Sequence, residues 1–140
     1  MIKSNSFSKK EHLCGEKRIA TLFADGEAFI AYPLRIVFLI KPKTDVEPIS
    51  VMVSVPKKRF KRAVKRNRLK RLMREAYRLN KLMIKDKINE KQLQIHIAFH
   101  YISNEEIDFV TIDKKMKIAL EKLLIKIESY STDEEIETIN

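Results

Sequence analysis

Residues 49–79 read ISVMVSVPKKRFKRAVKRNRLKRLMREAYRL, and two structural patterns follow one another in this stretch. Up to residue 55, Ile and Val alternate with Ser and Met, which is the period of a strand with one buried face. Pro56 lacks a backbone donor and ends that strand. From residue 63 to about residue 84 the apolar residues recur at helical spacing, and basic residues fill the opposite arc. We therefore expect a strand, a basic loop and an amphipathic helix.

The positive charge of the chain is concentrated in the same stretch. The 140-residue sequence has a formal net charge of +10, from 29 Lys and Arg against 19 Asp and Glu. Fourteen of these basic residues, but only one acid (Glu75), lie between residues 57 and 85, so the rest of the chain is slightly acidic. One dense basic segment on a nearly neutral body indicates a polyanionic partner that binds in a single orientation.

The flanking sequence predicts further elements. We expect a helix over residues 16–24, strand structure within residues 28–41, a strand over residues 93–100, and a final amphipathic helix after a capping box at residues 103–106. In the strand at 93–100, the alternation turns Gln94, His96, Ala98 and His100 outward.

These elements predict one α+β domain over residues 1–130, followed by an acidic, disordered tail over residues 131–140. The order helix–strands–basic helix–strand–helix favours a two-layer sandwich with the helices mainly on one face of the sheet. If the strands at 49–55 and 93–100 are neighbours, the helix between them makes them parallel.

Composition narrows the cellular context. No apolar run approaches the roughly 20 residues that span a bilayer, and residues 1–10 lack the apolar stretch of a signal peptide. Cys14 is the only cysteine, which excludes an intrachain disulfide. We therefore expect a cytoplasmic protein that is not associated with a membrane.

Catalytic motifs are weak. His96 and His100 have a spacing that suits a metal on a helix, but on a strand they lie about 13 Å apart, too far for one ion. His12 and Cys14 would need two further ligands to hold zinc. The acids form no recognisable pair, so we expect no catalytic residue and no metal ligand in this chain.

The basic segment can be read in two ways, as a solvated helix face or as a phosphate-binding surface. A solvated face usually mixes signs, with acidic and basic residues four apart. Between Lys57 and Arg74 there is no acid, so the side chains repel one another unless an anion neutralises them. Arginine forks and lysines arranged along one helix face can follow a nucleic-acid backbone.

This block resembles the protein subunit of bacterial ribonuclease P. The resemblance is carried by a Lys pair after an alternating strand and by an Arg-Asn-Arg signature in the basic helix: Lys57-Lys58, Arg62-Ala63, Lys65-Arg66-Asn67-Arg68-Leu69-Lys70-Arg71-Leu72, Arg74-Glu75 and Tyr77. It extends from about residue 13 to residue 127, although outside residues 49–79 it depends mainly on element order and apolar spacing.

The resemblance implies a fold like that of small ribosomal proteins, with a left-handed βαβ crossover. It implies a ribonuclease P holoenzyme in which a catalytic RNA subunit, using Mg²⁺ bound mainly by RNA and substrate, removes the 5′ leader of precursor tRNA. The protein is accessory, with one copy per RNA. It binds the RNA subunit and holds the single-stranded leader in a cleft.

Carried over by position, the resemblance implies two sets of site residues. The RNA-binding set is Lys57, Lys58, Arg62, Lys65, Arg66, Asn67, Arg68, Lys70, Arg71 and Arg74. The leader-binding set is Phe23, Phe38, Ser54, Asn67 and Lys70. Core packing is an equally good interpretation of Phe23 and Phe38, because both lie on apolar arcs, and Ser54 equally suits an ordinary solvated position.

The sequence departs from the family pattern at three places. Ile19 stands where the family usually has Phe, Pro56 replaces a small residue before the Lys pair, and Phe99-His100 replace basic residues. Two other functions remain open at this stage. One is a general or ribosomal RNA-binding protein that uses the same helix, and the other is a protein-only nuclease that uses His96 or His100.

Overall fold

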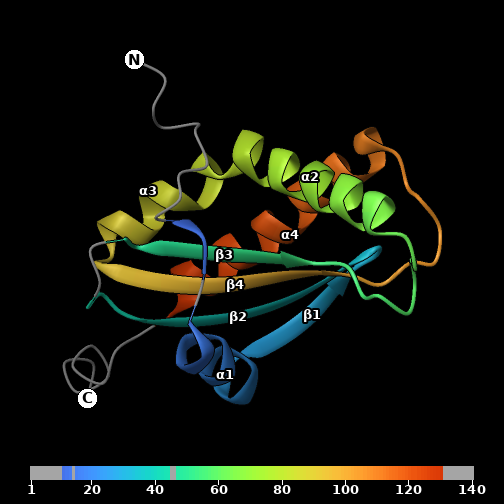
Figure 1. Ribbon diagram of the computed structural model, residues 1–140. Helices are drawn as coiled ribbons and strands as arrows, with labels where there is room; N and C mark the ends of the chain where they lie inside the picture. The colour runs from blue at the N-terminus through green and yellow to red at the C-terminus, as the bar shows by residue number, and fades with distance from the viewer. Residues whose placement is uncertain (1–10, 14, 45–46, 131–140) are drawn as a thin grey trace.

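The computed structural model describes residues 11–13, 15–44 and 47–130, and Figure 1 shows how their helices and strands are arranged. Along the chain the elements are α1 (Glu16–Asp25), β1 (Glu27–Ala31), β2 (Leu34–Pro42), β3 (Ile49–Ser54), α2 (Ala63–Asn80), α3 (Leu82–Glu90), β4 (Leu93–Tyr101) and α4 (Phe109–Ser129). This order confirms the predicted α+β class. The predicted acidic tail at residues 131–140 lies outside the described residues.

The strands form one four-stranded mixed sheet in the order β1-β2-β4-β3. The stretch at 28–41 is divided at Tyr32-Pro33, a cis peptide bond, into the hairpin of β1 and β2. β2 pairs with β4 in antiparallel fashion, whereas β3 pairs with β4 in parallel, as predicted. β3 is therefore an edge strand. A short backbone segment borders it, since His12 forms a bridge with Val51 and Leu13 N donates to Val51 O at 2.8 Å.

The connection from β3 to β4 is a left-handed crossover. In Figure 1 both strands point to the right with β4 below β3, and the chain returns behind the sheet through α3. Crossovers between parallel strands are right-handed in about 98% of cases. The unusual hand predicted from the resemblance is thus present.

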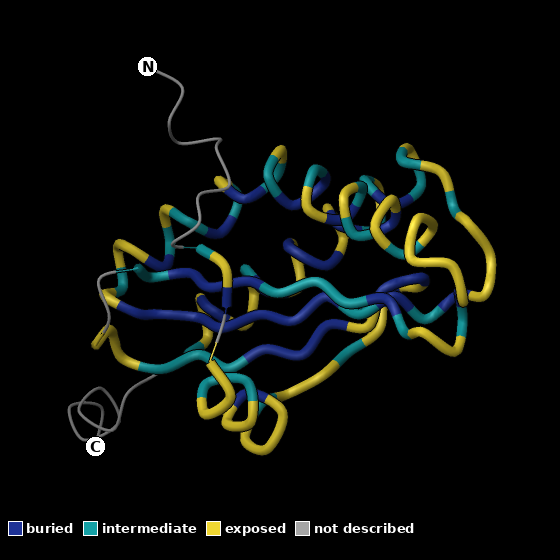
Figure 2. Tube along the Cα trace, in the orientation of Figure 1, coloured by how far each residue is buried: buried dark blue, intermediate teal, exposed yellow. Residues whose placement is uncertain are grey.

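The main core lies between the sheet and the layer of α2, α3 and α4. Alternate residues of β2, β3 and β4 point into it, and Figure 2 shows the central strands as mostly buried. The helical spacing predicted for α4 is confirmed, because its apolar stripe is fully buried: Ile112, Met116, Ala119, Leu120, Leu123 and Ile127. Burial of each Ile, Leu or Met side chain in this stripe contributes about 1.5–3 kcal/mol.

The opposite face of the sheet is covered in part by α1 and the segment before it. Leu13 and Leu22 pack there with Val37 and Ala98. The prediction that Gln94, His96 and Ala98 face solvent is wrong, because all three are buried beneath this second layer or its neighbouring loops. Gln94 accepts a hydrogen bond from Thr44 N at 2.7 Å. Alternation thus identified the two sides of β4 but not whether the polar side is covered.

Two helix boundaries differ from the sequence interpretation. The predicted single helix to residue 84 is two helices, because Asn80 Nδ2 donates to Ala76 O at 2.7 Å and to Asp113 Oδ1 at 2.7 Å where α2 ends. The predicted capping box at 103–106 does not cap α4. Asp108 is the N-cap instead, and its Oδ1 accepts from Thr111 N at 2.9 Å. Hydrogen bonding by the side chain of Thr111, and then by its backbone, lowers the pKa of Asp108.

A buried ion pair fixes the joint between α2 and α3. Lys81 Nζ lies 2.8 Å from Glu11 Oε1, and the two side chains are 2% and 14% exposed. The pair ties the segment before α1 to the helical layer. None of the helices in the described part of the chain is long and apolar enough to cross a membrane.

We expect Glu11→Gln to lower the free energy of unfolding by about 3 kcal/mol, because Lys81 would keep a buried charge without its carboxylate. Urea unfolding followed by circular dichroism measures this change. The matched control is Glu90→Gln, which breaks the exposed Lys87–Glu90 pair and should cost less than about 0.5 kcal/mol. Equal losses in the two variants would show that the Glu11–Lys81 pair has no special role.

Candidate nucleic-acid interface

Helix α2 separates apolar from basic side chains. Its buried residues are Leu69, Met73, Ala76 and Tyr77, which pack into the main core. The predicted phosphate contacts lie on the other side, where Arg68, Arg71 and Arg74 are exposed. These three are spaced by three residues, so they form a row along one face of the helix.

The one acid of α2 does not neutralise that row. Glu75 is engaged by Arg78, whose Nη2 lies 2.6 Å from Glu75 Oε1, and this hydrogen bond lowers the pKa of Glu75. Among the described residues, Lys70, Arg71 and Arg74 form no ion pair. The structure therefore presents uncompensated positive charge along α2, as the sequence predicts.

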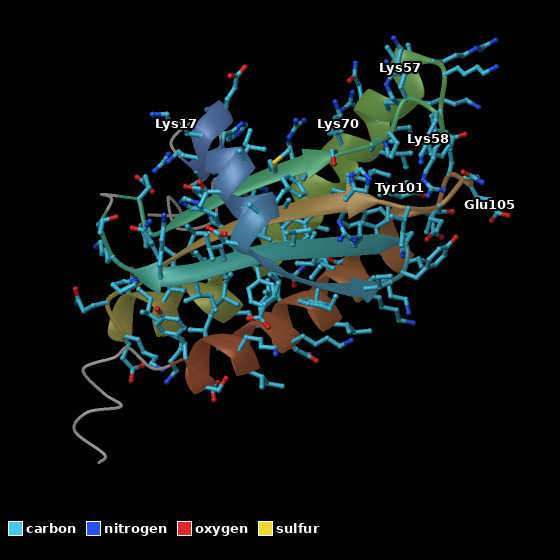
Figure 3. The ribbon with its side chains drawn as sticks, turned by 90° about the horizontal axis from the view of Figure 1, so that it is seen from below. Lys17, Lys57, Lys58, Lys70, Tyr101 and Glu105 are labelled. Carbon is cyan, nitrogen blue, oxygen red and sulfur yellow. The ribbon has the colours of Figure 1, made fainter. Side chains whose placement is uncertain are left out.

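The basic row and α1 lie on the same side of the molecule. Figure 3 shows Lys70, on α2, and Lys57 and Lys58, on the loop before it, on the side of the sheet that carries Lys17 of α1. Between α2 and the edge of the sheet is a groove of about 230 Å³. Its walls are Arg74 of α2, residues 51–53 of β3, and the segment with His12 and Leu13.

Beyond the end of α1, a polar row crosses the same face of the sheet. Strand register aligns Arg35 with His100 and His100 with Ser54. The Ser54 hydroxyl and His100 Nδ1 form a hydrogen bond. Partial burial lowers the pKa of His100, and the nearby charges of Arg35, Arg59 and Lys58 lower it further. The imidazole is therefore mainly neutral at pH 7 in a cationic environment.

The sequence interpretation did not connect Arg35 and Arg59 with this site. Arg35 is one of the residues that face the α1 side of β2, opposite Leu34 and Ile36 of the core. The signal was present in the alternation of β2, where Arg35 stands between two core residues.

The two predicted leader aromatics have different surroundings. Phe23 of α1 is 48% exposed, so its ring is accessible to a ligand. Phe38 is 2% exposed and belongs to the main core, where its ring meets Phe29 at a centroid distance of 5.9 Å. Phe38 thus lies on the face of the sheet turned away from α1. Its environment is that of core packing, the other interpretation left open by the sequence.

Arg66, the first arginine of the Arg-Asn-Arg signature, is engaged by the protein itself. Its Nη1 donates to Phe60 O at 2.8 Å and to Lys61 O at 2.9 Å. The side chain therefore holds the basic loop against the first turns of α2. Asn67 and Arg68, the other two signature residues, remain exposed, and Lys70 is half-buried.

His96 and His100 are not arranged as a pair of metal ligands. His96 is buried under the second layer and His100 lies four residues further along the same strand, as the strand interpretation predicted. Within the described residues, no three His, Cys, Asp or Glu side chains are grouped so that they could hold a metal ion. Of the candidate pair His12 and Cys14, Cys14 lies outside the described residues.

The geometry thus combines a basic helix face, a groove and an exposed aromatic side chain. The sequence also matches a family model described as Ribonuclease P, over residues 7–124. The chain belongs to the ribonuclease P protein family.

The similarity to relatives in that family extends over most of the chain. It is 48% identical over 120 residues to the ribonuclease P protein component of Porphyromonas gingivalis W83, covering 86% of this chain and 85% of that protein. It is 30% identical over 121 residues to the ribonuclease P protein component of Clostridioides difficile, covering 86% and 98%.

Solved ribonuclease P proteins share the fold. The protein from Thermotoga maritima superposes with a TM-score of 0.63 at 24% identity, covering 80% of this chain and 96% of that one. The protein from Staphylococcus aureus gives a TM-score of 0.64 at 17% identity, covering 81% and 94%. At these identities the likeness concerns the fold, and it confirms the predicted architecture.

The polar row of this ribonuclease P protein predicts that the charge of Arg35 influences the pKa of His100. Arg35→Gln removes the largest of the charges that depress the pKa of His100, so we expect that pKa to rise toward its ordinary value. Titration of the imidazole resonances by NMR measures it. Lys41→Gln, at the far end of the same face of β2, is the control and should leave the pKa unchanged. A His100 pKa unaffected by Arg35→Gln would disprove the electrostatic coupling.

Proposed function

We propose that this chain is the accessory protein subunit of a ribonuclease P ribonucleoprotein, in which an RNA subunit removes the 5′ leader of precursor tRNA. Membership of the family supports assembly with ribonuclease P RNA. The single observation that carries the proposal is the row of exposed arginines on α2, in which Arg71 and Arg74 form no ion pair among the described residues. Such a row is suited to phosphates spaced along an RNA backbone.

The proposed mechanism is electrostatic. Lys57, Lys58, Arg68, Arg71 and Arg74 neutralise phosphates of the RNA subunit and release its counterions, which favours assembly and lowers the Mg²⁺ concentration that the RNA requires. Arg66 contributes by fixing the loop that carries the Lys pair. Mg²⁺ is bound mainly by RNA and substrate in this proposal, and no step is assigned to a metal on the protein.

The leader is proposed to lie between α1 and α2. Phe23 offers an exposed ring on which a base can stack regardless of its identity, which suits a leader that differs from one tRNA to another. Asn67, Lys70 and Ser54 supply polar groups on the same side. Phe38 is not part of the proposed cleft, because its ring is enclosed in the core.

Cleavage of a precursor tRNA at low Mg²⁺ tests the proposal directly. The reactions contain the cognate RNA subunit, this protein, both or neither. We expect efficient formation of a single 5′-matured product only when both are present. Cleavage by the protein alone would indicate a protein-only nuclease. RNA-subunit activity that is unchanged by the protein at every Mg²⁺ concentration would indicate a general RNA-binding protein.

For the RNA contact, we expect Arg71→Ala to weaken binding to the RNA subunit and to reduce the slope of log K against log salt by about one. Filter binding between 50 and 200 mM salt measures both quantities. Lys126→Ala, near the end of α4, removes an equal charge and is the control. If both variants change the slope equally, net charge rather than a phosphate contact at Arg71 determines the effect.

For the leader contact, we expect Phe23→Ala to weaken holoenzyme binding of precursor tRNA by about 1 kcal/mol or more, the value of one base–aromatic stack, and to spare mature tRNA. The control is Ile125→Ala, which shortens another exposed apolar side chain, on α4. Equal weakening of precursor and mature tRNA by Phe23→Ala would exclude a specific leader contact.

A further inference from the structure

A second concave site lies at the other end of the basic segment, between the loop before α2 and the loop after β4. It has a volume of about 330 Å³. One wall carries Arg59, Lys61, Arg62 and Lys65, and the other carries Asn104 and Glu106. Four cations thus face one carboxylate across a solvent-accessible pocket.

Glu106 is the anion of this pocket. Its carboxylate lies 3.5 Å from Lys65 Nζ and 3.4 Å from Arg68 Nη1. Lys65 and Arg68 belong to the exposed face of α2 that we assign to RNA, so Glu106 is bound where a phosphate oxygen would bind. The side chains of Lys65, Arg68 and Glu106 are 48%, 64% and 35% exposed, and such accessible ion pairs are weak enough to exchange.

The loop that carries Glu106 is held in place from the core. Tyr101 is fully buried, and its hydroxyl donates to Glu105 O and accepts from Ile107 N at 3.0 Å. The backbone on both sides of Glu106 is therefore fixed by one side chain, and Figure 3 shows Tyr101 and Glu105 at this end of the sheet. The position of the carboxylate is set by the fold and not only by its attraction to Lys65 and Arg68.

On the opposite wall, Arg59 is oriented by a hydrogen bond across the pocket. Arg59 Nη1 donates to Asn104 Oδ1 at 2.9 Å, which orients the guanidinium beside the pocket. Its Nε is buried and has no acceptor within the described part of the chain. The groups of Arg59 that can meet a ligand are therefore those of its guanidinium fork beside Asn104, and not the enclosed Nε.

We propose that this pocket binds a phosphate of the RNA backbone and that Glu106 is a built-in competitor for Lys65 and Arg68. An RNA that places a phosphate in the pocket displaces the carboxylate, whereas an RNA that only approaches the basic face does not. Glu106 thereby lowers the affinity for unspecific RNA more than that for the cognate RNA. The inference rests on the proposed function, since it takes RNA as the ligand.

The test compares Glu106→Gln with Glu105→Gln, which removes the same charge from the neighbouring exposed residue. Binding to the cognate RNA subunit and to poly(U) is measured from 50 to 200 mM salt. We expect Glu106→Gln to tighten poly(U) binding about two- to fivefold, as loss of a weak ion-pair competitor allows. The gain for the cognate RNA should be smaller, and Glu105→Gln should have little effect on either.

A double-variant cycle identifies the contacts. In a Lys65→Ala, Arg68→Ala background, Glu106→Gln should give no gain, because the groups that it liberates are absent. Thermal unfolding checks that the variants remain folded, and Glu106→Ala gives a second measurement without an amide in the pocket.

Three results would overturn the proposal. Equal tightening by both glutamine variants would indicate long-range charge alone. Weaker binding of Glu106→Gln would show that Glu106 positions Lys65 and Arg68 for RNA. A gain that persists without Lys65 and Arg68 would place the competition elsewhere. Failure of the wild-type protein to prefer its cognate RNA would count against the proposed function, while the poly(U) comparison would still test the pocket.

Discussion

Two neighbouring strands that run in the same direction cannot be joined by a tight turn, so the pairing of β3 with β4 requires a long connection that crosses the sheet. In this protein that connection is the basic segment itself. Its apolar side is fixed against the main core by Leu69, Met73 and Tyr77. The other side must then face solvent at the edge of the sheet, and the position of the arginines follows from strand topology.

The same segment carries a local conflict between charge and secondary structure. No acid lies in the first turn of α2, and the residue before it, Arg62, makes no side-chain capping bond. Positive charge at a helix N-terminus opposes the helix dipole. The helix forms because burial of its apolar stripe outweighs that cost, and the carboxylate of Glu106 beside Lys65 and Arg68 offsets part of it. Such a local violation of helix preferences is expected at functional sites.

Much of the fold was predictable because periodicity reports directly on which side of an element is buried. The parallel pairing, the apolar stripe of α4 and the two faces of α2 all followed from the sequence. The burial of Gln94 and His96 did not follow from the sequence, because alternation cannot show that α1 and its neighbours lie on the polar side of β4. The division at Lys81 and the cap at Asp108 depend on tertiary hydrogen bonds from Asn80 and on the path of the loop held by Tyr101.

The candidate site likewise has some features that the sequence predicts and others that only the structure shows. Charge density alone located the basic face, and the exposed positions of Arg68, Arg71 and Arg74 agree with helical spacing. Sequence could not distinguish Phe23 from Phe38, because both lie on apolar arcs and only three-dimensional packing separates an exposed ring from a core ring. Nor could it show that Arg66 binds backbone carbonyls, or that Glu106, distant in sequence, is next to Lys65 and Arg68.

The short segment bordering β3 has a consequence for self-association. An open edge strand offers unpaired backbone groups to the edge of another molecule, and proteins usually obstruct such edges. Here the bridge between His12 and Val51, with the bond from Leu13 N to Val51 O, occupies the middle of the β3 edge. The residues that begin the described chain therefore obstruct pairing of this edge with a sheet of another molecule, and they do so without covering the basic face of α2.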